Sequence, residues 1–350
     1  FVQRMKERTR KRLLLLGGIA AGSALFAMAY GPIIGQFQGF EVSPRVLLRF
    51  GIHGLMFGVF VGWFEVFYAN GVGAEWFRRQ PFISSVLIKT TLMTFIIIAV
   101  LLFGGMMILP ERLAADNALT FLVIDVVVAF GLALVFQLIL AVRSVVGGRV
   151  LGNLIIGRYH RPLKEERIFL FLDLAGSTAM AEKMGDIAAQ SLITRFFFDV
   201  AQVTLAYGGE THRYIGDEVV VTWPIERGLR DAACLECCFA IEDRIAKRAA
   251  DYERRFGVVP SYRIGLHGGP VVAAECGDDK HEIVYFGDTI NTAARIEEYC
   301  KESGYSLLLS GDLISKMTLP KKLKAKLVGN VQFRGRVSET EIYNVARSET

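Results

Sequence analysis

Residues 168–178 read Ile-Phe-Leu-Phe-Leu-Asp-Leu-Ala-Gly-Ser-Thr, an apolar run that closes on an acid and is followed by small residues. An apolar run of this length predicts a buried strand. The small residues predict a tight turn into a helix that continues to about Tyr207, with Ser177 or Thr178 as its cap. At such a helix start the backbone N–H groups of Gly176, Ser177 and Thr178 are suited to binding phosphate oxygens.

A hairpin is predicted for residues 211–223, which read Thr-His-Arg-Tyr-Ile-Gly-Asp-Glu-Val-Val-Val-Thr-Trp, with Gly216 and Asp217 at its turn. An acid at a tight turn projects toward neighbouring strand ends, so Asp173 and Asp217 are predicted to share a site. Two such carboxylates suit magnesium, and two ions together activate an attacking hydroxyl and stabilise a leaving phosphate. Taken alone, either acid is better explained as a turn or cap residue.

A helix start is predicted within residues 285–295, which read Tyr-Phe-Gly-Asp-Thr-Ile-Asn-Thr-Ala-Ala-Arg. Asn291 and Arg295 are four residues apart, so they lie on one face of this helix. An amide and a permanent cation on one face are suited to orienting a ribose and to stabilising charge on a phosphoryl group. The alternative for this pair is an ordinary solvated helix face.

These three motifs, in this order and spacing, resemble the catalytic domain of the class III adenylyl and guanylyl cyclases. The resemblance extends over about residues 165–346 and implies an α/β ferredoxin-like fold. It implies that Asp173 and Asp217 hold two ions of Mg²⁺ or Mn²⁺, with the carbonyl group of Leu174 as an added ligand.

The resemblance also assigns the remaining residues of the site. It implies that Asn291 orients the ribose, that Arg295 stabilises the transition state, and that Arg336 contacts the terminal phosphates. In this family the acids come from one chain and the Asn and Arg from the other. Because this chain holds both sets, a homodimer with two sites is implied. The implied reaction is attack of the ribose 3′ hydroxyl on the α-phosphate, which forms a 3′,5′-cyclic nucleotide and releases pyrophosphate.

Arg213 and Val284 stand at the two positions that read the base in this family. Adenylyl cyclases typically carry Lys and then Asp or Thr there, and guanylyl cyclases carry Glu and Cys. Arg213 is a permanent donor, suited to adenine N1 or guanine O6, and Val284 has no polar group. The missing Glu favours ATP as the substrate. The alternatives are a guanylyl cyclase, and a membrane receptor or scaffold with an inactive cyclase fold.

The apolar residues gather in the first 145 positions, although the whole chain is 52% hydrophobic with a mean hydropathy of +0.38. Four stretches there are long enough to cross a bilayer, so an all-α transmembrane four-helix bundle is predicted. The predicted spans are residues 13–35, 46–67, 82–109 and 118–142. The predicted domains are a basic tail (1–12), the transmembrane domain (13–142), a linker (143–167) and the catalytic domain (168–350).

Basic residues decide the predicted orientation. Arg78, Arg79 and Lys89 flank the connection between spans two and three, which places this connection and both termini in the cytoplasm of an integral inner or plasma membrane protein. Basic residues at both membrane edges predict contact with the lipid bilayer. Nucleic acid is not an expected partner, because no pattern of interleaved basic and aromatic residues accompanies the charge.

Three polar residues within the predicted spans, His53, Glu65 and Asp125, mark a possible sensor for an unknown membrane-domain ligand, because buried charge in a membrane is costly. The alternative is a structural pair between helices. In the soluble half, Cys234, Cys237 and Cys238 share one helical face and are predicted to pack as small buried hydrophobic residues, as in a reducing compartment.

Overall fold

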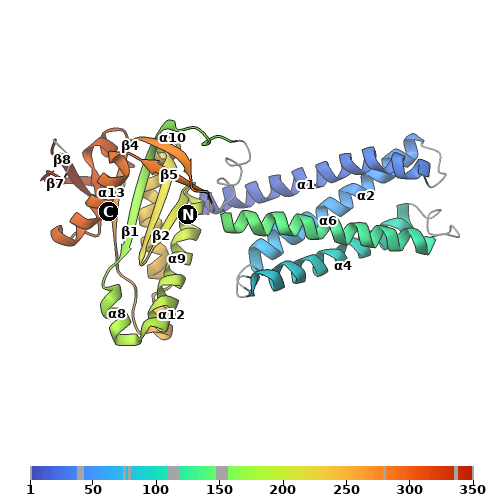
Figure 1. Ribbon diagram of the computed structural model, residues 1–350, viewed down its shortest axis with the longest axis horizontal. Helices are drawn as coiled ribbons and strands as arrows, with labels where there is room; N and C mark the ends of the chain where they lie inside the picture. Colours follow the sequence, from blue (N-terminus) through green and yellow to red (C-terminus); the bar gives the residue numbers. More distant parts are fainter. Residues whose placement is uncertain are drawn as a thin grey trace. The chain divides into compact units, whose positions relative to one another are not determined.

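The computed structural model describes residues 2–37, 43–73, 76–77, 80–108, 118–146, 157–278, 281–334 and 338–348 (Figure 1). The chain divides into two compact units, Phe1–Gly152 and Asn153–Thr350.

The N-terminal unit is built from helices. It contains α1 (Val2–Phe37), α2 (Pro44–Trp63), the π-helix η1 (Phe64–Val72) that continues α2, α4 (Phe82–Ile108) and α6 (Ala118–Val146). Among the described residues, three segments are long and apolar enough to cross a membrane, namely Leu13–Ile33, Pro44–Ala69 and Phe82–Val100. Within the described part of α6, a shorter apolar stretch covers Ala133–Val142. All four predicted spans are therefore helical, and the count of four crossings stays a prediction.

Small residues allow α1 and α2 to approach closely. A Cβ atom on Gly54 would lie 2.5 Å from the carbonyl oxygen of Ser23, and one on Gly58 would lie 2.6 Å from the Cα atom of Ala20. Glycines four residues apart on one helical face are a common means of packing helices in lipid, where dispersion contacts replace the hydrophobic effect. The local sequence of α2 thus fits a membrane-embedded helix pair.

The soluble unit is a mixed sheet with helices. The sheet order is β2-β3-β1-β4-β6-β8-β7, with β5 paired to β4. The strands are β1 (Leu163–Leu174), β2 (Glu210–Ile215), β3 (Glu218–Pro224), β4 (Tyr262–Cys276), β5 (Glu282–Phe286), β6 (Leu307–Ser310), β7 (Leu323–Val331) and β8 (Thr340–Arg347). The helices are α8 (Ser177–Met184), α9 (Asp186–Ala206), α10 (Ile225–Leu229), η2 (Arg230–Ala232), α11 (Ala233–Lys247), α12 (Ala249–Phe256), α13 (Asp288–Ser303) and α14 (Gly311–Ser315).

The first four strands define the fold. Helices α8 and α9 join β1 to the β2–β3 hairpin, and α10 to α12 join β3 to β4. The four strands lie in the order β2-β3-β1-β4 with every neighbouring pair antiparallel. This βαββαβ arrangement is the predicted ferredoxin-like fold, and the hairpin turn falls at Gly216 and Asp217 as expected.

Three local predictions were wrong. Strand β1 begins at Leu163 instead of residue 168, because the charged residues before the apolar run pair in register with Gly269–Ala273 of β4. The helix predicted from residue 177 to 207 is broken at Gly185, whose φ of 82° ends α8 and starts α9. The N-cap is Gly176, and the side chain of Ser177 turns to another partner.

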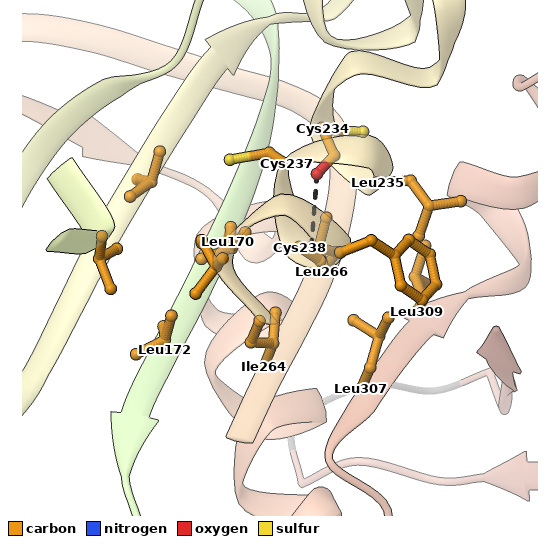
Figure 2. Close-up of a cluster of buried hydrophobic side chains, with 14 of the residues drawn as sticks. Leu170, Leu172, Cys234, Leu235, Cys237, Cys238, Ile264, Leu266, Leu307 and Leu309 are labelled. Atoms are coloured by element: carbon orange, nitrogen blue, oxygen red, sulfur yellow. Dashed lines mark hydrogen bonds between the residues drawn. The ribbon is translucent and has the colours of Figure 1, made fainter. Parts of the chain in front are cut away.

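The core of the soluble unit lies between the sheet and α9 and α11. Figure 2 shows Leu170 and Leu172 of β1 beside Ile264 and Leu266 of β4, with the cysteines of α11 packed against them. Cys234, Cys237 and Cys238 are buried within this core, which confirms the predicted packing role. Burial raises the pKa of the Cys234 thiol to about 12, so this thiol is unreactive at neutral pH.

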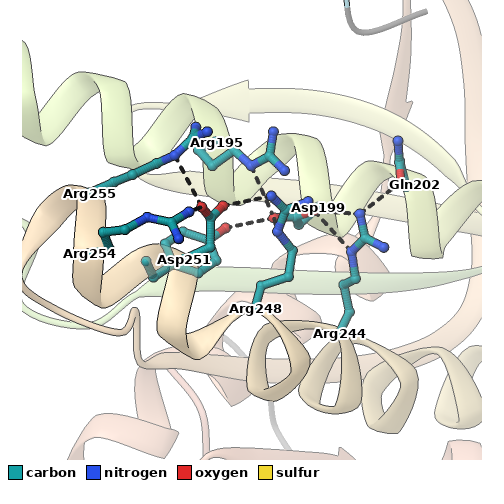
Figure 3. A network of polar contacts seen from close by, with 9 residues as sticks. Arg195, Asp199, Gln202, Arg244, Arg248, Asp251, Arg254 and Arg255 are labelled. Carbon is teal, nitrogen blue, oxygen red and sulfur yellow. Dashed lines mark hydrogen bonds and ion pairs between the residues drawn. The ribbon is translucent and has the colours of Figure 1, made fainter. Parts of the chain in front are cut away.

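A buried acid connects the helices of this layer (Figure 3). Asp199 of α9 is fully buried and forms an ion pair with Arg244 of α11 at 2.9 Å. It also pairs with Arg195 at 3.4 Å and Arg248 at 3.5 Å, and accepts a hydrogen bond from the Tyr252 hydroxyl at 2.9 Å. One carboxylate thus joins α9, α11 and α12.

We expect Asp199→Ala to destabilise the soluble unit by about 3 kcal/mol, because the change leaves several guanidinium groups without their shared counter-charge. The loss is measurable as faster maleimide labelling of the buried cysteines in denaturant. The matched control is Asp251→Ala, which removes a partly exposed acid from the same network (Figure 3) and should cost clearly less stability than Asp199→Ala. Equal losses in the two variants would contradict a special role of Asp199.

Candidate active site

The two predicted metal acids meet at one end of the sheet. Asp173, the penultimate residue of β1, lies opposite Glu218 of β3 and Arg263 of β4 in the strand register. The β2–β3 turn approaches the same end, because the backbone N–H of Leu174 donates to the carbonyl oxygen of Asp217 at 3.3 Å. Local strand and turn geometry therefore brings Asp173, Leu174 and Asp217 together, as predicted.

The predicted phosphate-binding turn lies beside Asp217. The Ser177 hydroxyl donates a hydrogen bond to Asp217 Oδ2, so the first residue of α8 is tied to the hairpin turn. Gly176 adopts a left-handed conformation with φ 74°, and the N–H of Ala175 donates to the carbonyl of Ser261 at 2.9 Å. Thr178 is exposed at the start of α8. These bonds hold the turn against the acids.

Arg263 is a site residue that the sequence analysis missed. Its Nη2 atom lies 2.8 Å from Asp173 Oδ2, and its Nε atom lies 3.3 Å from Glu297 Oε1 on α13. The feature of the sequence that could have indicated this role is an arginine near the start of a strand made mainly of apolar residues and glycine. A permanent cation in that place balances part of the charge of the acids.

The acids crowd one another electrostatically. Burial raises the pKa of Asp173, and the neighbouring Asp217 adds to the rise while Arg263 opposes it. Burial and nearby carboxylates also raise the pKa of Glu218 and of Glu297, each to about 7. One guanidinium among four carboxylates leaves a negative cluster, which a divalent cation would stabilise.

The donor set fits magnesium or manganese held jointly with a substrate. Carboxylate and carbonyl oxygens are the ligands these ions prefer, and Mg²⁺ is commonly held by one or two carboxylates plus phosphate oxygens. Across the described residues, no three His, Cys, Asp or Glu side chains form a complete metal cage. The pair Asp173 and Asp217 therefore suits a site that is completed by phosphate oxygens.

We expect the metal-free protein to lose stability as the pH rises from about 4.5 to about 7. Glu218 and Glu297 keep their protons in this window when folded and release them when unfolded, so rising pH favours unfolding. Thermal unfolding at several pH values measures the slope, which should become flatter in Glu297→Gln. Glu302→Gln, at an exposed position of the same helix, is the control. An identical slope in wild type and Glu297→Gln would contradict the assignment.

Asn291 and Arg295 lie on α13, as predicted. Asn291 is exposed, whereas the Nη1 atom of Arg295 is buried without a hydrogen-bond partner among the described residues. A buried donor without a partner is rare in proteins, so this atom makes Arg295 a candidate for binding a ligand that accepts its hydrogen bond. Phosphate oxygen is an acceptor of the right kind.

The two halves of the predicted site lie on different sides of α13. Glu297 faces β4, where a Cβ atom on Gly265 would come within 2.3 Å of its backbone nitrogen. At 100° per residue, Arg295 is rotated by about 160° and Asn291 by about 120° from Glu297. Their face therefore points away from the Arg263–Asp173 pair of the same chain.

The two predicted base-reading positions lie on β2 and β5. Strand β5 reaches β2 because the Tyr285 ring packs against His212 with ring centroids 5.0 Å apart. The Arg213 guanidinium pairs with Glu282, two residues before Val284 on β5. Sequence analysis missed Glu282, because the family pattern directs attention to position 284.

The other predicted residues are placed as follows. Arg336 lies outside the described residues, although Phe333 just before it is buried against Ile296 of α13. In the N-terminal unit, Glu65 on η1 is buried and accepts a hydrogen bond from Gln137 of α6 at 3.0 Å. This is the interhelical pair that the sequence analysis gave as the alternative to a sensor. His53 is partly exposed on α2, and the Asp125 side chain lies outside the described residues.

Residues 162–346 match the family model of the adenylate and guanylate cyclase catalytic domain. The chain therefore belongs to the adenylate and guanylate cyclase family, which confirms the predicted resemblance. Proteins of this family generally use divalent metal ions, bind nucleotide substrates and usually dimerise.

Individual relatives agree with this placement. The chain is 44% identical over 198 residues to Adenylate cyclase 2 of Rhizobium meliloti (strain 1021), which covers 57% of this chain and 54% of that protein. It is 25% identical over 187 residues to Adenylate cyclase 1 of the same organism, covering 52% of this chain and 28% of that protein. The chain thus spans about half or less of the length of these relatives. The crystal structure of the adenylyl cyclase CyaB from P. aeruginosa superimposes with a TM-score of 0.48 at 19% identity, over 54% of this chain and 97% of that chain.

Proposed function

We propose that this chain is a membrane-anchored adenylate cyclase, which converts ATP into 3′,5′-cyclic AMP and pyrophosphate at sites shared between two copies of the chain. The observation that carries the proposal is the meeting of Asp173 and Asp217 at one sheet end, beside Arg263 and the start of α8. The 44% identity to a protein named adenylate cyclase supports ATP as the substrate.

In this proposal Asp173, Asp217 and the carbonyl of Leu174 hold two ions of Mg²⁺ or Mn²⁺. When bound, these ions would make the ribose 3′ hydroxyl more acidic and neutralise charge on the phosphates. In this role Asp173 and Asp217 bind the ions through their ionised carboxylate oxygens. Arg263 and Ser177 orient the two carboxylates through their hydrogen bonds.

The phosphates are bound by donors from several elements. The backbone N–H groups of Gly176, Ser177 and Thr178 face the phosphates at the start of α8, and Arg336 contacts the terminal ones. Arg295 donates to the α-phosphoryl group, where charge builds up as the 3′ oxygen attacks, and its buried unpartnered Nη1 atom is suited to this bond. Asn291 orients the ribose on the same helical face.

The same geometry supports a homodimer. The face of α13 with Asn291 and Arg295 points away from the acids of its own chain, so the acids of a second copy complete the site. Apolar side chains near the base-reading strands support a protein interface: Tyr214 and Ile215 of β2 and Phe286 of β5 are 49%, 52% and 52% exposed.

The N-terminal unit anchors the enzyme in this proposal. Residues 13–142 form the transmembrane domain, with the basic tail 1–12 and both termini in the cytoplasm. Residues 143–167 then connect it to the catalytic domain, residues 168–350. The buried Glu65–Gln137 bond joins η1 to α6. His53, Glu65 and Asp125 are the residues of this unit that we propose as a sensor for an unknown ligand.

The proposal is tested with the purified full-length protein, offered ATP and GTP separately with Mg²⁺ or Mn²⁺. We expect cyclic AMP from ATP, in a reaction that a chelator stops. Cyclic GMP as the main product would reverse the base assignment. No product from either nucleotide, in a folded dimer, would overturn the proposal in favour of a receptor or scaffold with an inactive cyclase fold.

A further inference from the structure

The outward face of β5 carries an acid, an aliphatic residue and an aromatic residue in a row. Side chains alternate along a strand, and the buried residues of β5 are Ile283 and Tyr285, each 8% exposed. Glu282, Val284 and Phe286 therefore share the opposite face, where Phe286 is 52% exposed. Glu282 is thus the polar neighbour of Val284 on one accessible surface.

Arg213 completes this surface from β2. Its Nη2 atom donates to Glu282 Oε2, and the two side chains are 44% and 36% exposed. A guanidinium has five N–H donors and a carboxylate has about four acceptor positions. The pair therefore offers further donors and acceptors side by side after its own bond is made.

We propose that Glu282 is the second base-reading residue of this enzyme and acts with Arg213, in place of the apolar Val284. This inference rests on the proposed function. The Watson–Crick edge of adenine presents a donor, the 6-amino group, beside an acceptor, N1. Arg213 donates to N1 and Glu282 accepts from the 6-amino group, while Val284 and Phe286 contact the flat apolar ring.

The order of donor and acceptor decides which purine fits. Guanine carries an acceptor, O6, at the place of the 6-amino group and a donor, N1–H, at the place of the acceptor. Guanine in the same position would set O6 against the Glu282 carboxylate and N1–H against the Arg213 guanidinium. Both contacts are unfavourable, so the pair selects ATP over GTP.

The test exchanges the hydrogen-bond donor and the acceptor between positions 213 and 282 while keeping the ion pair. In the full-length double variant Arg213→Glu/Glu282→Arg, kcat/KM is measured for ATP and GTP. We expect the ATP-to-GTP ratio to fall by about tenfold or more, with turnover still present. An unchanged ratio would show that the pair is only structural and would overturn the inference. Should the double variant turn over neither nucleotide, competition of ATP and GTP against a fluorescent nucleotide supplies the same ratio without chemistry.

Two further variants separate the possible causes. Glu282→Gln keeps the size of the side chain and offers both a donor and an acceptor, so its ATP-to-GTP ratio should fall toward one. The charge swap Arg347→Asp/Asp243→Arg is the matched control, because this pair is 48% and 50% exposed on β8 and α11. A fall of the ratio in the control equal to that of the Arg213–Glu282 swap would overturn the inference. An inactive wild type would instead refute the proposed function.

Discussion

Replacing Asp217 by Asn should lower kcat by about a thousandfold, the largest single-residue effect we expect in this chain. Asn keeps the shape of the side chain and the backbone carbonyl that accepts from Leu174, so the hairpin turn stays in place. It removes the negative charge on which binding of the divalent ion depends. Cyclic AMP formation at saturating ATP and Mg²⁺ measures the loss.

Ser177→Ala is the matched variant for Asp217→Asn. It removes the hydroxyl that donates to Asp217 Oδ2 and leaves the carboxylate itself. Because Ser177 acts through Asp217, its removal should cost about 10- to 100-fold, and higher Mg²⁺ should recover part of the loss. Labelling of the buried cysteines checks that both variants are folded. Full activity of folded Asp217→Asn would exclude the metal role of this residue.

Mixing two inactive chains should restore activity, which is the second large effect. In a dimer of Asp217→Ala with Arg295→Ala, one site loses both groups while the other keeps both. Purification over two affinity tags leaves only mixed dimers, each with one active site of two, so about half of the wild-type activity should return. Cyclic AMP formation after co-expression with two affinity tags, and purification over both, measures the recovery.

The decisive control places both changes in one chain. A dimer of wild type with the double variant Asp217→Ala/Arg295→Ala has the same composition, but each of its sites then lacks one essential group. It should be inactive if the sites are shared between chains. If each chain had a complete site of its own, the double-variant dimer would keep half the activity and the first mixed dimer would have none.

Several features of this protein follow from short stretches of sequence. The strand that ends in Asp173, the hairpin turn at Gly216 and Asp217, and the common face of Asn291 and Arg295 depend on residues within a few positions of one another. Strand alternation, turn preference and helical period operate over that distance. The apolar helices of the N-terminal unit are equally local, because a bilayer sets their length and composition. The resemblance to the cyclase family could be inferred from these motifs and their order along the chain.

Other features required the folded chain. Arg263 meets Asp173 and Glu297 only because β1, β4 and α13 pack together, although these residues are 90 and 34 positions from Arg263. Glu282 reaches Arg213 across 69 positions because Tyr285 holds β5 against His212. The extension of β1 to Leu163 depends on a partner strand more than 100 residues later. Such contacts depend on which surfaces pack together, and short-range sequence patterns do not encode this. Only the tertiary structure therefore places Arg263 and Glu297 beside Asp173, and Glu282 beside Arg213.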